Sequence, residues 1–210
     1  MPASEVRLGG ALLAIGSAVI VIVTGLYAAL PALVSAPLPA TAALSEVLAA
    51  TAPLADRLTF IGRLGLCGDL LLILGASLLV LRADESALKR LLWLGLGLST
   101  AIFLAVDGLT GFVYGAVTAD PSAFGVARRL YDLAFLVGTA AFGLGAVGGA
   151  LEKADAAWLR GLWALVALLG IGSFGLASFG IVLPLALGAA VGLAGLGGAL
   201  AGWQAYRSQA

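Results

Sequence analysis

Six long apolar segments constrain the fold of this 210-residue chain more than any other feature. Each has at least 23 residues, which in a helix is enough to cross a hydrocarbon core of roughly 30 Å. A membrane β-barrel would show short segments of alternating polarity instead. The sequence therefore predicts an all-α, polytopic membrane protein, a single-domain bundle of six transmembrane helices. The expected spans cover residues 8–30, 58–81, 91–117, 123–150, 156–178 and 181–203.

The start of the chain allows two interpretations. Val34, Ser35 and Ala36 resemble the small-residue site at which a signal peptide is cleaved. The apolar region of a signal peptide has about 7–15 residues, and this segment is longer, so we expect a retained first helix, with cleavage as the alternative. Residues 31–56 hold four prolines, which break helices. We expect this stretch to be an external loop with a short interfacial helix at 41–51 and Glu46 toward water.

Basic residues near the ends of the segments predict an orientation. Lys and Arg of the loops fall on one side of the predicted bundle, whereas the three connections on the other side carry acids only. By the positive-inside rule, both termini are expected in the cytoplasm. The four tryptophans fall near the same face, where an interfacial aromatic belt is expected. The basic residues counted for this side are Arg7, Arg82, Lys89, Arg90, Lys153, Arg160 and Arg207.

Composition argues against several classes of function. The formal net charge is zero and no basic tail is present, so nucleic acid is not an expected partner. The chain has no histidine and a single cysteine, Cys67, which removes the usual ligands of haem, zinc and iron–sulfur centres. Without histidine, nucleophilic hydrolases also lose their usual base. We therefore expect no cofactor, no metal and no catalytic residue, and the balance leans away from an enzyme.

Charged residues inside the spans are the candidate functional residues. A charge in a bilayer costs roughly 2.5–3.5 kcal/mol on insertion scales, so such groups are usually paired, face a cavity or have a function. Three acids and three bases suggest mutual neutralisation. Both arginines of the fourth span can reach the acid of the same helix, because they precede it by four and three residues. The six residues are Arg63, Asp69, Asp107, Arg128, Arg129 and Asp132.

Two tyrosines complete the expected cluster. Tyr114 lies on the polar stripe of the third span that also contains Asp107, and Tyr131 neighbours Asp132. At 1.5 Å per residue, all six charges fall in the outer half of the bilayer or at its midplane. One interpretation is an ion-pair staple between the second, third and fourth helices. The other is a polar pocket, open to the outer face, that binds or transports a small polar or anionic ligand.

Details of the cluster bear on the second interpretation. Arginine favours planar oxyanions such as carboxylate or phosphate, and Asp69, the deepest acid, is the best candidate for a proton-coupled step. A membrane enzyme acting on lipid, or an aspartyl pair of Asp69 and Asp107, is a third and weaker possibility. Cys67 is expected to be a packing residue. The bilayer is the expected partner, and glycine-rich helix faces favour packing within the bundle or a homo- or hetero-oligomer.

The order of these features resembles an uncharacterised bacterial family of six-helix membrane proteins of unknown function. The resemblance rests on RLTFIGRLGLCGDLLLILGASLLVLR and ESALKRLLWLGLG, then ARRLYDLAFLVGTAAFGLGAV, AAWLRGLWALVALLGI and LPLALGAAVGLAGLGGALAGW. The chain departs from the family pattern at Asp107, where Arg and Glu are expected, and lacks a proline before Trp158. The resemblance implies a multi-pass protein of the bacterial cytoplasmic (inner) membrane. It implies no activity.

Overall fold

The computed structural model describes residues 3–39, 41–82 and 85–208, and within these ranges the chain is helical without a strand. Six helices are long and apolar enough to cross a membrane, as the sequence predicts. Short helical elements fill parts of the connections. In chain order the elements are α1 (Ala3–Ala28), α2 (Ala32–Ser35), α3 (Leu44–Thr51), a 3-10 turn (Ala52–Leu54), α4 (Ala55–Val80), α5 (Ala87–Gly108), a π-helical turn (Leu109–Val113), α6 (Tyr114–Val117), α7 (Pro121–Leu151), α8 (Ala157–Ser178) and α9 (Pro184–Arg207).

Local sequence signals explain where several helices begin. The Ser86 side chain accepts a hydrogen bond from a backbone N–H of the first turn of α5, and Asp120 does the same for α7. Pro184 opens α9 at a position where a missing N–H costs nothing. Between α8 and α9 the chain turns at Gly180, whose φ of 80° lies in the left-handed region that glycine tolerates.

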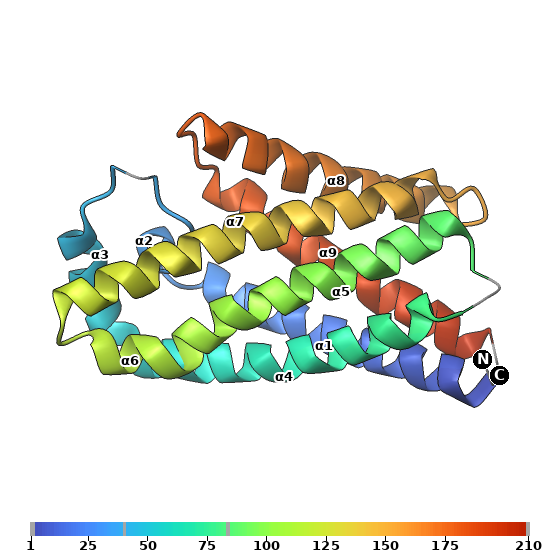
Figure 1. Ribbon diagram of the computed structural model, residues 1–210, viewed down its shortest axis with the longest axis horizontal. Helices are drawn as coiled ribbons and strands as arrows, with labels where there is room; N and C mark the ends of the chain where they lie inside the picture. The colour runs from blue at the N-terminus through green and yellow to red at the C-terminus, as the bar shows by residue number, and fades with distance from the viewer. Residues whose placement is uncertain (1–2, 40, 83–84, 209–210) are drawn as a thin grey trace.

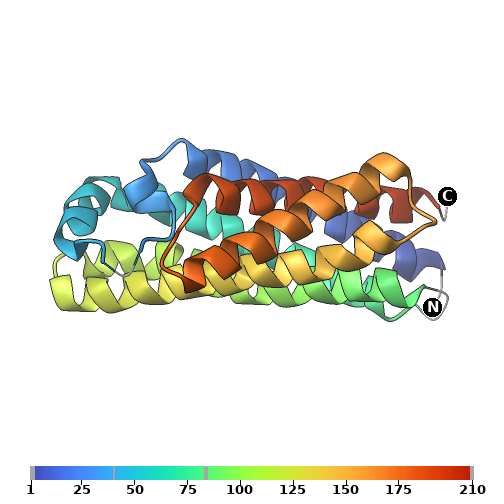
Figure 2. The same cartoon turned by 90° about the horizontal axis from the view of Figure 1, so that it is seen from above.

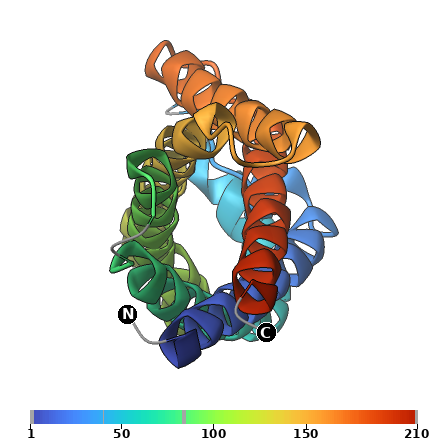
Figure 3. The same cartoon turned by 90° about the vertical axis from the view of Figure 1, so that its right-hand side faces the viewer.

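The six long helices form a ring around the axis of the bundle. α1 packs on α4 and α9, α4 packs on α5, α5 on α7, α7 on α8, and α8 on α9, which closes the ring (Figures 1 and 3). Both ends of the drawn chain lie at one end of the bundle, here called the terminal end (Figure 1). The opposite end carries the cap, defined as residues 29–39 and 41–54, which includes α2 and α3 (Figures 1 and 2).

Glycine permits close approach where neighbouring helices cross. A Cβ atom added to Gly16 of α1 would lie 2.6 Å from the backbone nitrogen of Leu72 in α4. A Cβ on Gly145 of α7 would lie 2.6 Å from the Cα atom of Gly95 in α5. Helices meet through small residues in the same way in lipid, where van der Waals contact drives association. Gly188 of the predicted α9 stripe has no such neighbour within 4 Å, so glycine marks packing at some positions only.

Large side chains fill the ring toward the terminal end. Trp163 of α8 is fully buried, and its ring occupies the space left by Gly149 of α7 and Gly197 of α9. Trp93 is buried too, so the expected belt of four surface tryptophans is wrong for these two residues. Trp158 is exposed because five residues of helix separate it from Trp163, which places the two on different faces. Trp93 and Trp163 therefore belong to the core of the terminal half of the bundle.

Candidate functional site

The structure divides the six charges predicted from the sequence into three separate groups. Arg63 lies alone on the outside of the bundle. Arg128, Arg129 and Asp132 lie together beneath the cap. Asp69 and Asp107 form a third group in the interior. The structure therefore does not bring the predicted residues into a single cluster.

Arg63 is exposed on α4 and contacts α5. Its Nε atom donates a hydrogen bond to the carbonyl oxygen of Gly111 at 3.2 Å, and its guanidinium lies over the exposed ring of Phe112. Arg63 and Asp69 are six residues apart on one helix, so their side chains leave it in directions about 120° apart. The two side chains therefore do not line one pocket. Cys67, one turn from Arg63, is likewise exposed, which corrects its expected place in the packed interior.

Arg128 joins α7 to the cap. The side chain is fully buried, and its Nη1 atom donates a hydrogen bond to the carbonyl oxygen of Val34 at 2.6 Å. Nη2 donates to the carbonyl oxygen of Ala36, and Nε donates to Oδ1 of Asp132 at 3.1 Å. The i,i+4 pair expected from the sequence is therefore present, with the cap backbone as an additional partner. This guanidinium has no open side for an anionic ligand.

Neighbours of Arg128 strengthen the same attachment. Tyr131 donates its hydroxyl hydrogen to the carbonyl oxygen of Ser35 at 2.7 Å, and the backbone N–H of Leu38 donates to Asp132 at 3.3 Å. Arg129 lies 3.7 Å from the second oxygen of Asp132. The buried ring of Tyr114 packs on Tyr131, with ring centres 5.9 Å apart. We call Arg128, Tyr131 and Asp132 the cap latch.

Asp69 of α4 and Asp107 of α5 meet inside the ring. Their exposed fractions are 1% and 3%, and both side chains line one cavity. No Lys or Arg lies within ion-pair distance of either acid in the part of the chain that the structure describes. The expected mutual neutralisation is therefore wrong for this pair, because the three arginines are engaged elsewhere.

The two acids differ in how firmly they are held. Asp107 accepts a hydrogen bond from the Tyr27 hydroxyl at 3.1 Å, and that hydroxyl also lies 2.8 Å from Oγ1 of Thr110. Oδ2 of Asp69 is buried without a hydrogen-bond partner among the described residues. Asp107 is thus oriented by α1 and its own helix, whereas Asp69 has an unused acceptor.

Backbone features of α4 and α5 make room for the pair. A Cβ atom on Gly65 would collide with the carboxylate of Asp107, and one on Gly62 would lie 2.7 Å from the Asp107 carbonyl oxygen. Directly after the end of α5, residues Leu109–Val113 form a π-helical turn, a feature that is frequent at functional sites. Close helix contact through glycine therefore places the Asp107 side chain beside α4.

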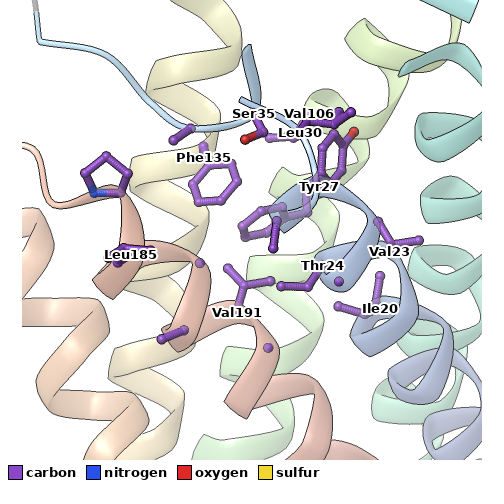
Figure 4. Close-up of a pocket in the computed structure, with 18 of the residues that line it drawn as sticks. Ile20, Val23, Thr24, Tyr27, Leu30, Ser35, Val106, Phe135, Leu185 and Val191 are labelled. Carbon is purple, nitrogen blue, oxygen red and sulfur yellow. The ribbon is translucent and has the colours of Figure 1, made fainter. Parts of the chain in front are cut away.

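A cavity of about 530 Å³ borders the acid pair in the half of the bundle that faces the cap. Its size is within the range of small-molecule sites. Figure 4 shows Thr24 and Tyr27 of α1 opposite Leu185 and Val191 of α9, with Phe135 of α7 behind them. The wall is mostly apolar. Its polar side chains are those of Thr24, Tyr27, Ser35, Asp69 and Asp107.

Exposure of the lining residues shows where the cavity opens. Deep residues such as Phe103 and Val106 are buried, whereas Leu185 at the start of α9 is 91% exposed. Ala28 at the end of α1 and Ala189 of α9 are exposed as well. The mouth thus lies between α1 and α9 and is edged by apolar and small side chains. Part of the cap, including Ser35, also lines the cavity.

Sequence reasoning missed Tyr27 and the aromatic walls of this site. Phe103 lies one turn before Asp107 on the polar stripe of the third span, and this spacing could have placed it beside the acid. No comparable pattern marks Tyr27, at the end of the first span, or Phe135. No group of three or more metal-ligating side chains occurs among the described residues. An acid pair beside an apolar cavity can accept hydrogen bonds from a ligand or balance a positive charge.

No protein-family model matches the chain, and no curated protein or solved structure matches it either. The resemblance to a six-helix bacterial family therefore stays a prediction.

Proposed function

We propose that this chain is a multi-pass membrane protein that takes a membrane-soluble ligand into the cavity between α1 and α9. The observation that carries the proposal is the cavity, whose mouth lies between two candidate membrane spans. Because the edge of the mouth is apolar, a molecule dissolved in the bilayer meets it without a polar barrier. The unpartnered oxygen of Asp69 is the polar contact that orients such a ligand.

The chemistry of the cavity favours a different ligand from the one suggested by the sequence. The arginines of the sequence suggest a small polar or anionic ligand. Arg128 is occupied by the cap, and Arg63 faces away. An anion beside two carboxyl groups and no base is unfavourable. A ligand with an apolar body and a hydrogen-bond-donating or positive end fits better. Transport of this ligand across the membrane belongs to the same proposal.

A structural subunit is the second candidate. The cap latch favours it, since Arg128, Tyr131 and Asp132 hold two parts of the chain together and need no ligand. The acid pair does not favour it, because two carboxyl groups without a basic partner are poor structural fasteners. The third possibility, an enzyme acting on lipid, would use the same acid pair.

Photolabelling separates these candidates. The protein in lipid nanodiscs is irradiated with a neutral, diazirine-bearing hydrocarbon, and labelled residues are mapped by mass spectrometry. We expect labels on buried lining residues such as Phe103 as well as on the exposed surface. Ala189→Trp fills the mouth and should remove the interior labels. Ala101→Trp, at an exposed site of α5 outside the cavity lining, is the matched control. Labels confined to the surface in every variant would exclude the binding function and leave the structural subunit.

We further propose a bacterial cytoplasmic membrane as the location, with the terminal end in the cytoplasm. The proposal is supported by the basic residues that gather at the terminal end. The exposed Arg57 lies at the cap end and is the exception to this charge bias. In a Cys67→Ala background, Ser45→Cys on the cap should react with a membrane-impermeant maleimide in intact cells. Ser208→Cys at the terminal end should react only after permeabilisation. The reverse pattern would overturn the orientation.

A further inference from the structure

The charge of the cavity limits the ligand that it can take. Asp69 and Asp107 both line it, and none of the lining residues is Lys or Arg. Asp69 is 1% exposed and has an oxygen without a partner, so it has an unmet need for a donor or a cation. A charge buried in apolar surroundings is costly unless it is paired. A bound cation would supply the missing partner.

Aromatic rings form the walls next to this pair. Tyr27, Phe103, Phe135 and Phe142 all line the cavity. The Phe103 ring meets Phe135 edge-on at 5.2 Å between centres and is stacked on Phe142 at 5.5 Å. The faces of such rings attract cations, above all organic cations that carry little water. Carboxylate and aromatic faces thus act in the same direction in one apolar chamber.

The structure assigns to this cavity a lipophilic organic cation as ligand, held by Asp69 and by the aromatic wall. This inference rests on the proposed function and deepens it, because it names the ligand class of the same site. The apolar mouth admits the hydrophobic body from the bilayer, and the positive centre comes to lie at Asp69. Asp107, fixed by Tyr27, carries the second carboxyl group of the site.

Two probes of the same shape and opposite charge test the inference. Tetraphenylphosphonium and tetraphenylborate are titrated by equilibrium dialysis into the purified protein in nanodiscs, with empty nanodiscs as the blank. Neutral triphenylphosphine oxide is the third probe. We expect saturable binding of the phosphonium ion only. Asp69→Asn should weaken it roughly thirty-fold or more, as expected for the loss of a buried charge pair. Asp56→Asn, at an exposed site in the first turn of α4, is the matched control and should not.

Each outcome bears on the inference. Binding of the neutral probe with equal strength would overturn the cation and leave the membrane-ligand function standing. Saturable binding of tetraphenylborate would also refute the inference, because it would show that the cavity does not select cations over anions. If no probe binds, the inference fails, and the photolabelling result decides separately on the cavity. Because Asp69→Asn removes a buried acid, its thermal unfolding is recorded beside the binding, and a folded variant with unchanged phosphonium affinity would also overturn the inference.

Discussion

Replacing Arg128 by methionine should release the cap from α7. Methionine keeps the apolar length of the side chain and removes all donors. Three acceptors then lose the bond from Arg128: the carbonyl oxygens of Val34 and Ala36, and the carboxylate of Asp132, which keeps the Leu38 N–H. Because Arg128 is fully buried, water does not replace these contacts while the cap stays in place.

The magnitude follows from the number and burial of these bonds. Hydrogen bonds to a charged group contribute about 1.5–3 kcal/mol each, so three of them set an upper bound of roughly 9 kcal/mol. The cap lies at the end of the bundle and can move toward water, which lowers the cost. Breaking a buried ion pair on one side costs about 3–5 kcal/mol, and we expect a loss in this range. For a chain of this size it corresponds to a fall of about 10 °C in the unfolding midpoint.

Thermal unfolding in nanodiscs, followed by hydrogen exchange of the cap, measures the effect. Arg128→Lys keeps one charge but loses the planar fork, so it should fall between the wild type and Arg128→Met. Arg57→Met, at an exposed site of α4, is the control for loss of an arginine. Exchange should rise in residues 29–39, which include α2, and not in the six long helices. If Arg128→Met unfolds within about 2 °C of Arg57→Met, apolar packing holds the cap and the reasoning is wrong.

Two further perturbations test other parts of the bundle. Gly65→Ala places a Cβ against the Asp107 carboxylate, and this overpacking should lower the free energy of unfolding by about 1–3 kcal/mol. Gly108→Ala, with nothing within 4 Å, should raise it by up to about 1 kcal/mol through helix propensity. Equal midpoints of the two variants in thermal unfolding would contradict the close contact at Gly65. Glu152, beyond the end of α7, accepts a hydrogen bond from Ser86, which lowers the pKa of its carboxyl below the ordinary 4.5. A lowered pKa stabilises the fold above that value and the effect is lost as the pH falls, so Glu152→Gln should lower the midpoint at pH 7 and converge with wild type toward pH 3. A constant difference across this range would show that the charge of Glu152 is not the cause.

Periodicity and length in the sequence are sufficient to predict the helices but not their arrangement. The six spans follow from apolar runs, and the pairing of Arg128 with Asp132 follows from their spacing on one helix. The closed ring depends on which glycine meets which backbone, as at Gly145 and Gly95, and such contacts leave no trace in a single sequence. The burial of Trp163 has the same origin, since its space exists only between two other helices.

Charge balance was a poor guide to the site for a physical reason. Counting three acids and three bases assumes that buried charges seek each other. Arg128 instead satisfies two of its donors on backbone carbonyl oxygens of the cap, which a count of charged side chains cannot include. Arg128 uses its other bond on Asp132, so none of its donors reaches Asp69 or Asp107, and these two acids have no basic partner. The unequal supply of donors, rather than the net charge, creates the site.

Asp69 offers the clearest way to distinguish a ligand site from a structural one. A buried oxygen without a partner contributes nothing to the folded state and costs about 1–3 kcal/mol. Asp69→Leu should therefore leave the unfolding midpoint of the ligand-free protein unchanged or raise it, while it abolishes phosphonium binding. Sites that bind ligands often show this exchange of stability for function. If Asp69→Leu instead lowers the midpoint as much as Arg128→Met does, Asp69 is part of the internal fastening of the helices, and the cavity has lost the group on which its selectivity depends.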